Sequence, residues 1–399
     1  MKLFYITASF PFGIGESFLI QELEALKNTG IEIFIIPTFP RGKLRKDWKI
    51  ISDNYTLFIE KPLYLKLLLY LLSFMCLNPV PFYKLLMLLK GSTFLQLMKN
   101  LAVLPKSIYL KYLIEKEKPE HIHVHWGATP STAAMLAAFG TSVPWSLSCH
   151  RWDIYENNLL KKKSENSKFI RFISKKGKTD ALKFKILPKK SFVIPMGTKI
   201  AKKLNCPIWQ NNDAEFKIIC PANLIPVKGH VFLIEAIHLL LIQGYRVKLK
   251  LAGEGYLKNK LENIIKEKKI TNNVEFLGHL DHKALLDLYA DAKVHLMVLP
   301  SVDLGNGEHE GVPVSLMEAM SYGVPVISTE TGSINELLPK EYGLTVPDKN
   351  SFELAQKIKS IYDNPEEYIR ISMLCRNLIQ KDWNVNLSSR KLISLIEQQ

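Results

Sequence analysis

A chain of 399 residues is long enough for two α/β domains of ordinary size, each able to bury a core of its own. Apolar residues make up 47% and charged residues 23%, a balance that excludes a fibrous or disordered chain. The five cysteines are widely spaced and form no CxxC pair, which argues against a disulfide framework or a zinc knuckle and favours a reducing cytoplasm. The N-terminus enters an apolar run directly and lacks the features of a signal peptide.

The positive charge is confined to the first half of the chain. Residues 1–200 hold 30 Lys and Arg against 14 Asp and Glu, while residues 201–399 hold 23 against 24, so the whole +15 excess is N-terminal. This asymmetry predicts an anionic partner of the first half, either an acidic lipid surface or a phosphate-bearing substrate. Nucleic acid is not expected, because the basic residues are mostly lysines and no nucleic-acid-binding motif accompanies them.

Short β-branched runs alternate with longer amphipathic segments, the pattern of a parallel sheet wrapped by helices. We predict two Rossmann-like domains, at 1–195 and 216–375, joined by a linker over 196–215, with a C-terminal helix over 376–399 that packs back on the first domain. Ligands of such sheets bind beyond the carboxyl ends of the strands, so two domains facing each other would enclose a cleft. The predicted strands are KLFYIT, IEIFII, HIHVHW, PWSLSC and FIRFIS in the first half, and FKIICPA, RVKLKLAG, NVEFLG, VHLMVLP and VPVIST in the second.

The loop from Ser9 to Ser17 follows the first predicted strand. Its glycines, Gly13 and Gly15, permit a close approach of the backbone to a phosphate or an acceptor. We therefore assign both glycines to the predicted binding site.

A Leu-rich segment punctuated by lysines interrupts the first domain over 57–115. Its longest apolar run ends at Asn78-Pro79 after about 15 residues, which is shorter than the roughly 20 that a membrane-spanning helix needs. Two interpretations stay open. The helices cover the sheet, or they lie in the interface of an anionic membrane.

Three histidines, His121, His123 and His125, alternate along the next predicted strand and so project to one face, a spacing that superficially suggests a metal site. After the following strand comes a segment that reads His150-Arg151-Trp152-Asp153-Ile154-Tyr155. A structural histidine and a catalytic one remain alternatives for His150.

In the second half, the strongest motif opens a predicted helix near Pro313, whose missing N–H costs nothing in a first turn. The free amides of that turn and the helix dipole favour the negative charge of a diphosphate. Glu310 lies in the loop before the helix and Glu318 lies more than a turn inside it, so the two carboxylates reach different parts of one ligand. The motif reads Glu310-Gly311-Val312-Pro313-Val314-Ser315-Leu316-Met317-Glu318.

Three strand ends in the same half complete the predicted site. Lys228 ends a turn that opens a helix, Gly253-Glu254-Gly255 follows another strand, and Gly278 ends the next one. A dinucleotide fingerprint would need a glycine where Lys258 stands, which argues against NAD.

Together these motifs resemble glycosyltransferase family 4, whose C-terminal domain carries Glu, seven residues and Glu in the same setting. The resemblance spans nearly the whole chain, and the segment Ser9 to Leu26 looks like members of bacterial exopolysaccharide and colanic-acid assembly. It implies an α/β fold of two Rossmann-like domains of the GT-B type. It also implies transfer of a sugar, with retention at the anomeric carbon, from a nucleoside-diphosphate sugar to a saccharide or polyprenyl-linked acceptor.

The resemblance assigns roles to residues. It places Glu310 on hydroxyls of the donor sugar, Glu318 on the ribose and Lys228 on the diphosphate, while His150 faces the reacting sugar as a hydrogen-bond donor or a stabiliser of charge near the leaving group. Members of the family need no metal on their His-rich strand, so we expect neither a metal nor a cofactor here. The remaining donor-binding residues are Gly13, Gly15, Asn223, Gly253, Glu254, Gly278, Gly311, Val312, Pro313 and Val314.

One position departs from the family pattern, because Asn223 stands where the family has arginine. An amide donates hydrogen bonds without bringing a charge, so a cation on the diphosphate is lost. Weaker donor binding, compensation by a residue such as Arg151 and lost activity all stay open.

The chain is therefore expected to be a cytoplasmic enzyme, peripheral on the inner face of the membrane. Two alternatives remain, a sugar-nucleotide-binding protein that has lost catalysis and a peripheral membrane module that docks through 57–115.

Overall fold

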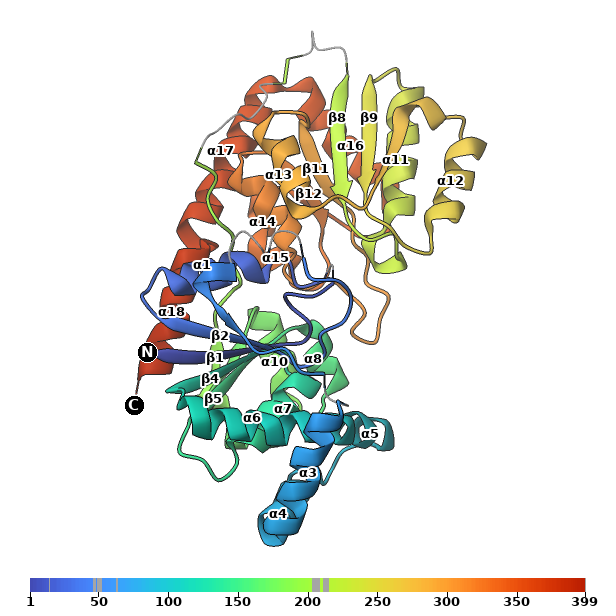
Figure 1. Ribbon diagram of the computed structural model, residues 1–399. Coiled ribbons are helices and arrows are strands. Elements are labelled where there is room, and N and C mark those ends of the chain that lie inside the picture. Colours follow the sequence, from blue (N-terminus) through green and yellow to red (C-terminus); the bar gives the residue numbers. More distant parts are fainter. Residues whose placement is uncertain are drawn as a thin grey trace. The chain divides into compact units, whose positions relative to one another are not determined.

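The computed structural model describes residues 1–399 with the exception of 14, 46–47, 49–51, 62–63, 203–208, 211–214 and 399. The chain divides into two compact units (Figure 1). Unit 1 consists of Met1–Pro195 and Ser388–Gln399, and unit 2 of Met196–Leu387. Each unit contains one parallel sheet with helices, which confirms the α/β fold predicted from the alternating pattern.

Unit 1 is built on a seven-stranded sheet in which every neighbouring pair is parallel. The central strands are buried on both faces, as expected of a parallel sheet covered by helices. In spatial order the strands are β3 (Thr56–Leu57), β2 (Glu32–Pro37), β1 (Lys2–Thr7), β4 (His121–His125), β5 (Trp145–Cys149), β6 (Ile170–Phe172) and β7 (Ser191–Val193).

The strand register of unit 1 separates an apolar face from a polar one. His123 pairs with Tyr5 on β1 and with Ser146 on β5, and Ser148 pairs with Arg171 on β6. Because side chains alternate along a strand, these residues share one face with His121 and His125. The other face carries the apolar core and packs on α6 (Leu104–Glu117) and α7 (Thr129–Ala138). Unit 1 also contains α1 (Leu19–Lys27), α8 (Arg151–Glu156), α9 (Leu160–Asn166) and α10 (Lys175–Leu182).

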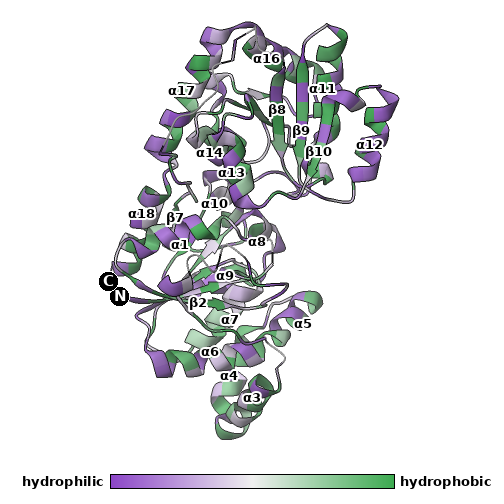
Figure 2. Cartoon of the chain, turned by 45° about the horizontal axis from the view of Figure 1, so that its top comes forward, coloured by the Kyte–Doolittle hydropathy of each residue, from purple (hydrophilic) through white to green (hydrophobic). Residues whose placement is uncertain are grey.

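The segment 57–115 forms a series of helices that differ in how much of their apolar surface is covered. α6 covers the sheet, and α3 (Leu65–Leu77) packs on α6. By contrast, Leu67 is the buried residue of α3 and Leu85 that of α4 (Pro79–Leu88), so most of their apolar side chains are not fully covered. Figure 2 shows the hydrophobic residues of the chain in green. The exposed apolar side chains include Leu65, Leu69, Leu72 and Leu77 on α3, Val80, Tyr83 and Met87 on α4, and Phe94, Leu95 and Met98 on α5 (Phe94–Ala102).

The predicted break at Asn78-Pro79 is present. Asn78 ends α3, and α4 begins at Pro79 with a bend of 114°. Within the described part of the chain no single helix has the length and apolar composition to cross a membrane, although α3 and α4 meet that test together as a bent pair.

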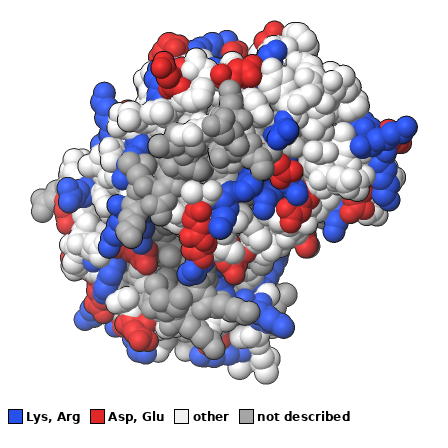
Figure 3. All heavy atoms as spheres, turned by 90° about the horizontal axis from the view of Figure 1, so that it is seen from above, with Lys and Arg blue, Asp and Glu red and all other residues white. Residues whose placement is uncertain are grey.

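Part of the N-terminal positive charge lies inside unit 1 and not on its surface. Lys106, Lys163 and Arg171 are fully buried. Lys106 Nζ donates to Glu60 O at 2.7 Å, and burial lowers the pKa of both Lys106 and Lys163 to about 7. The charge offered to a partner is therefore smaller than the residue count indicates, and on the face drawn in Figure 3 basic and acidic side chains are interspersed.

Unit 2 has a six-stranded parallel sheet, whose strands are connected in the same order as the first six strands of the unit 1 sheet. In spatial order its strands are β10 (Val274–Gly278), β9 (Val247–Ala252), β8 (Phe216–Pro221), β11 (Leu296–Leu299), β12 (Val326–Thr329) and β13 (Thr345–Val346). Its helices are α11 (His230–Ile242), α12 (Lys258–Glu267), α13 (His282–Ala290), α14 (Val314–Ser321), α15 (Ile334–Leu337), α16 (Ser351–Asp363) and α17 (Pro365–Asp382).

The first segment of unit 1 ends at Pro195, the predicted boundary, whereas the C-terminal boundaries differ from the prediction. α17 runs through residue 376 and belongs to unit 2, while α18 (Val385–Glu397) contributes its residues from Ser388 onward to unit 1. Lys168 Nζ donates to Ile396 O at 2.8 Å, so the C-terminal helix packs on unit 1 as expected. Within the predicted linker, Trp209 is buried and donates to Tyr362 O at 2.8 Å in unit 2. Residues 203–208 and 211–214 of that linker lie outside the described part.

Candidate functional site

In unit 2, Lys228 is presented by a tight turn at the carboxyl end of β8. The turn is a 3-10 helix, Pro226–Lys228, followed by Gly229 with φ +65° and then by α11. Asn223, earlier in the same loop, is exposed. The two residues predicted to meet a diphosphate thus lie on one loop beyond a strand end, where doubly wound sheets bind their ligands.

Gly253 allows the loop after β9 to lie directly against the loop after β8. A Cβ on this residue would lie 2.1 Å from Ala222 O, closer than any side chain can come. Ala222 N–H donates to Ala252 O at 3.0 Å, and Leu224 N–H donates to Glu254 O at 2.9 Å. This glycine is therefore needed for backbone packing, whatever else it contacts.

Glu254 reaches the next strand end. Its Oε1 would lie 3.7 Å from a Cβ placed on Gly278, which has φ +65° and ends β10 at a bulge in the β9–β10 ladder. The structure thus brings Glu254 and Gly278 together, and their contact with a ligand stays a prediction.

Glu310 and Lys228, 82 residues apart, contact each other directly. Lys228 Nζ lies 2.5 Å from Glu310 Oε2, and Ser301 Oγ donates to the same oxygen at 3.1 Å. The side chains of Lys228 and Glu310 are 21% and 15% exposed, so solvent screens the pair only partly. Two residues assigned to one site on separate grounds are therefore neighbours in the fold.

The backbone of Glu310 is held by the loop after β12. Ser333 N–H donates to Glu310 O at 3.3 Å, and His309 Nδ1 lies 2.9 Å from the same oxygen. Gly332 has φ +56°, and a Cβ there would lie 1.8 Å from Glu310 O. Ser301 and Gly332 carried no sequence signal, because each reaches Glu310 only through the tertiary fold.

The helix predicted near Pro313 begins at Val314, with Pro313 as its N-cap. Val312 and Pro313 are buried, and Gly311 and Val314 are half-buried. The N–H groups of the first helical turn have no partner within the helix, so this loop presents a row of donors.

Glu318, on the second turn of α14, contacts a residue that the sequence did not single out. His282 Nε2, at the start of α13, lies 2.7 Å from Glu318 Oε1. The Glu318 side chain is 7% exposed and the His282 side chain 19%. One oxygen of the carboxylate predicted to hold a ribose is therefore already bound to an imidazole.

In unit 1, His150 follows β5 and caps α8. Asp153 Oδ2 accepts from His150 N–H at 2.8 Å, and the His150 side chain accepts from Asp153 N–H, which forms a capping box. His150 Nε2 lies 2.8 Å from His125 Nε2. Burial and the neighbouring His125 hold the pKa of His150 well below its ordinary value.

Aromatic side chains surround the His150 ring. The ring centroid of Trp126 lies 4.5 Å from that of His150, and the centroid of Phe18 lies 5.8 Å from it. Arg151, the possible substitute for the missing arginine, lies in unit 1 and stacks on Trp152 at 4.3 Å.

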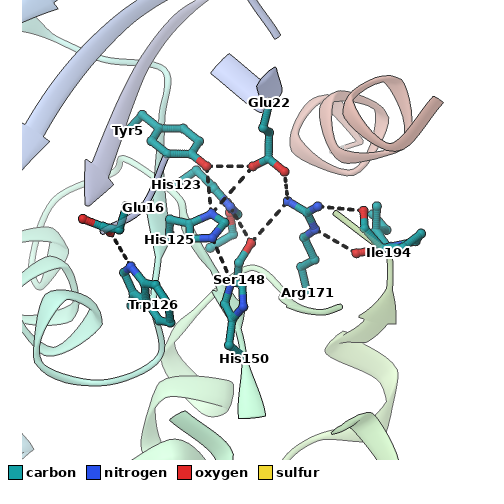
Figure 4. Close-up of polar contacts among 12 residues, drawn as sticks. Tyr5, Glu16, Glu22, His123, His125, Trp126, Ser148, His150, Arg171 and Ile194 are labelled. Carbon is teal, nitrogen blue, oxygen red and sulfur yellow. Dashed lines mark hydrogen bonds and ion pairs between the residues drawn. The ribbon is translucent and has the colours of Figure 1, made fainter. Parts of the chain in front are cut away.

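The loop after β1 is organised by a carboxylate of its own. The backbone N–H groups of Ala8, Ser9 and Phe10 donate to Glu16 at 3.1, 2.7 and 2.7 Å, and Trp126 Nε1 donates to the same carboxylate (Figure 4). Gly13 N–H donates to Lys43 O at 3.0 Å. Contact of Gly13 and Gly15 with a ligand phosphate stays a prediction.

The histidines of β4 bind hydroxyl and histidine partners. His121 Nε2 and His123 Nδ1 each lie 2.8 Å from Ser146 Oγ, while His125 faces Tyr5 and His150. Among the residues that the structure describes, no group of three His, Cys, Asp or Glu side chains is placed to hold a metal ion.

Comparison with known proteins identifies the second half of the chain. Residues 202–374 match the family described as Glycosyl transferases group 1. The putative colanic acid biosynthesis glycosyltransferase WcaL of Escherichia coli is 34% identical over 186 residues, which cover 45% of each chain. The amylovoran biosynthesis glycosyltransferase AmsK of Erwinia amylovora is 26% identical over 198 residues, which cover 49% of this chain and 48% of AmsK. The chain thus spans about half the length of the curated relatives it matches.

Solved structures share the fold of the whole chain. Anabaena Alr3699/HepE in complex with UDP-glucose has a TM-score of 0.73 at 16% identity, covering 99% of this chain and 98% of HepE. The GT-B type of fold expected from the sequence is thereby confirmed.

Proposed function

Since residues 202–374 form a glycosyltransferase group 1 domain, we propose that the protein transfers a sugar from a nucleoside-diphosphate sugar to a saccharide acceptor in surface-polysaccharide biosynthesis. The observation that carries this proposal is the contact between Lys228, in the turn after β8, and Glu310, in the loop before α14. The names of WcaL and AmsK, which refer to colanic acid and amylovoran biosynthesis, support the polysaccharide. The UDP-glucose complex of HepE supports the class of donor.

The donor is proposed to bind in unit 2 at the carboxyl ends of its strands. Lys228 and the first-turn amides of α14 take the diphosphate, because both present positive charge or donors on adjoining loops. Glu310 accepts from hydroxyls of the sugar and Glu318 from the ribose. In the ligand-free state Lys228 neutralises Glu310, so donor binding requires Lys228 to move to the diphosphate or to be shared by the two anions.

Transfer is proposed to proceed with retention, with the acceptor attacking from the face that the diphosphate leaves. Glu310 is bound by Lys228 and Ser301, which favours a positioning role over that of a free nucleophile. Proton NMR of the first-formed product tests this. Inversion at the anomeric carbon would contradict retention and leave the donor assignment intact.

No metal is proposed to be needed, because Lys228 and the α14 N-terminus provide positive charge for the leaving group. His150, in unit 1, is proposed to act on the reacting sugar. Asn223 keeps a second candidate open, a protein that binds the donor without turnover, because the loop at this position brings an exposed amide in place of a guanidinium.

The decisive experiment is a thermal-shift panel of UDP-, GDP- and ADP-sugars with and without EDTA, followed by a transfer assay. A ligand that binds the folded state raises its stability by mass action. A shift with one nucleotide, kept in EDTA and lost in Glu318→Ala, supports the donor site, and transfer lost in Glu310→Ala supports catalysis there. A shift without transfer or hydrolysis favours the binding protein, and no shift with any donor refutes the donor site.

A peripheral position on the anionic inner face of the cytoplasmic membrane, with a polyprenyl-linked acceptor, is also proposed. The supporting observation is the band of exposed apolar side chains on α3, α4 and α5, in a segment that has, besides the buried Lys106, six lysines and two acidic residues over 57–115. Interfacial binding combines burial of such a band with attraction of lysines to acidic lipid.

Cosedimentation with vesicles tests this position. Wild-type protein should bind vesicles that contain an acidic phospholipid more strongly than zwitterionic ones, and Leu69→Glu should weaken binding. Ile242→Glu, at a 68% exposed position on α11 in unit 2, is the matched control and should bind as wild type. Equal binding by Leu69→Glu and wild type would refute membrane docking through α3.

A further inference from the structure

The polar face of the unit 1 sheet contains a buried charge pair (Figure 4). Arg171 Nη1 donates to Glu22 Oε2 at 2.8 Å, and both side chains are at most 1% exposed. The guanidinium also donates to Ile194 O and Pro195 O, each at 2.9 Å. Although burial raises it, the pKa of Glu22 ends below its ordinary value because of Arg171, the nearby His125 and the hydrogen bond from Tyr5. Glu22 is therefore ionised and can only accept hydrogen bonds.

The hydroxyl of Tyr5 links this carboxylate to β4. Tyr5 Oη lies 2.7 Å from Glu22 Oε1 and 2.9 Å from His125 Nδ1. Burial, together with the nearby carboxylate, holds the pKa of Tyr5 well above its usual value, so the hydroxyl keeps its single proton. That proton is donated to Glu22, because an ionised carboxylate offers none. Tyr5 Oη then accepts from His125, which places a proton on His125 Nδ1.

The next link joins two imidazoles. His125 Nε2 and His150 Nε2 are 2.8 Å apart, so one of them must donate and the other accept. His125 is fully buried, and Arg171 already balances the charge of Glu22. A second proton on His125 would add an uncompensated buried charge, which is costly. With its proton on Nδ1, His125 accepts at Nε2 and His150 donates from Nε2.

The opposite side of the His150 ring is consistent with the same assignment. In the capping box of α8 the His150 side chain accepts from Asp153 N–H, which requires a ring nitrogen without a proton. An imidazole that accepts there and donates from Nε2 is neutral and has one defined tautomer.

We propose that Glu22, Tyr5 and His125 are positioning residues that hold His150 as a neutral imidazole with its proton on Nε2. The chain of donors runs from His150 through His125 and Tyr5 to Glu22, and Arg171 holds the carboxylate at its end. None of the three relay residues needs to touch a ligand for this effect.

Where it concerns catalysis, this inference rests on the proposed function. A neutral His150 brings no positive charge to a departing diphosphate, so the electrostatic role expected as one possibility from the sequence is not available to it. The role that remains is donation from Nε2 to a hydroxyl of the sugar, with the ligand oxygen taking the place of His125 Nε2.

The tautomer can be measured without any ligand. Protein with 15N-labelled histidine is studied by long-range 1H–15N correlation NMR, and the His150 signals are identified by their loss in His150→Gln. Wild type should show His150 and His125 as single neutral forms, protonated at Nε2 and Nδ1 respectively. A His150 protonated at Nδ1, or at both nitrogens, overturns the proposal.

Glu22→Gln tests the far end of the relay. The amide can donate to Tyr5 Oη, which frees the Tyr5 proton for His125 Nδ1 and reverses the donors along the chain, so His150 should lose its single tautomer. Transfer should fall in kcat, with the thermal shift by donor unchanged. A His150 spectrum identical to wild type would refute the relay.

Two further variants keep the test decisive. If Glu22→Gln does not fold, Tyr5→Phe leaves the Glu22–Arg171 pair in place and removes the acceptor of His125 Nδ1, whose next carboxylate oxygen is 3.7 Å away. Tyr5→Phe should broaden the His125 and His150 signals, and unchanged signals would count against the relay.

Ser146→Ala is the control, because it removes a buried hydroxyl that contacts His121 and His123 on the same sheet. It should leave the His150 signals and transfer unchanged. If no nucleotide sugar binds, the donor proposal fails while the NMR result still decides the relay.

Discussion

Lys228 Nζ and Glu310 Oε2 are 2.5 Å apart at the carboxyl edge of the unit 2 sheet, so the cation assigned to the diphosphate and the anion assigned to the sugar neutralise each other before a donor arrives. Each residue therefore has a partner to leave when the donor binds. Substitution of Glu310 and substitution of Lys228 should therefore cause different defects.

Glu310→Gln should reduce kcat by at least about 100-fold, the scale of losing one hydrogen-bonding group aimed at a transition state. Lys228→Met should chiefly reduce the thermal shift by the donor, because it removes the cation that takes the diphosphate. Steady-state kinetics and thermal shift on the two variants separate these effects. Equal donor shifts in Lys228→Met and wild type would contradict the role of Lys228.

His282→Ala should weaken donor binding by about tenfold, comparable to the loss of one hydrogen bond to a charged group. The imidazole holds Glu318 Oε1, and its loss removes one contact that orients the carboxylate toward a ribose. Titration of donor and of the free sugar phosphate by calorimetry checks this, since only the nucleoside-bearing ligand should respond. His282→Gln, whose amide can donate, should recover part of the affinity.

Gly332→Ala should abolish transfer. The added Cβ would meet Glu310 O at 1.8 Å and His309 Nδ1 at 2.6 Å, so the loop that carries Glu310 must move. Gly343→Ala is the control, because Gly343 also has positive φ, at +61°, but its Cβ would have no neighbour closer than 3.9 Å. Both variants should lose about 1–2 kcal/mol of stability through backbone strain. Loss of activity in both to the same extent would remove the steric explanation.

Unit 2 should lose stability as the pH falls from about 6.5 to about 4. His230 is buried, and burial, with Lys228 nearby, lowers its pKa from 6.5 to about 4, so the unfolded state binds the proton first. The contribution is fully present above pH 6.5 and lost as the pH falls towards 4, by up to about 3 kcal/mol.

Thermal unfolding at pH 7.5, 6 and 5 measures this dependence. His230→Met should reduce the slope with pH, while His238→Gln, half-buried on the same helix, should not. A slope unchanged in His230→Met would assign the acid sensitivity to other groups.

The fold was predictable because its strands carry local signals, and the exceptions lack them. β3, β7 and β13, each two or three residues long, are the strands that the sequence did not predict. β6 is equally short but was predictable, because it lies in the longer run FIRFIS. Lys228 and Glu310 were recognisable from the turns and the helix start around them.

Their supporting residues were not recognisable. Ser301 and His282 reach the two glutamates only across loops that the fold brings together. In unit 1, the histidines of β4 suggested a shared face, but their link to Glu22 depends on the packing of α1. The direction of that link is decided by one hydroxyl, Tyr5, inside an otherwise ordinary apolar strand.

The two units differ in how much of the chain must be synthesised before each unit is complete. Unit 2 is one continuous stretch, whereas unit 1 includes α18 from Ser388 onward, and Lys168 holds that helix at Ile396. On the ribosome, unit 2 can therefore be completed while unit 1, begun first, still lacks its last helix. Nascent unit 1 leaves the surface under α18 uncovered until the residues from Ser388 onward have been made, so unit 1 is completed only after the whole of unit 2 has been synthesised.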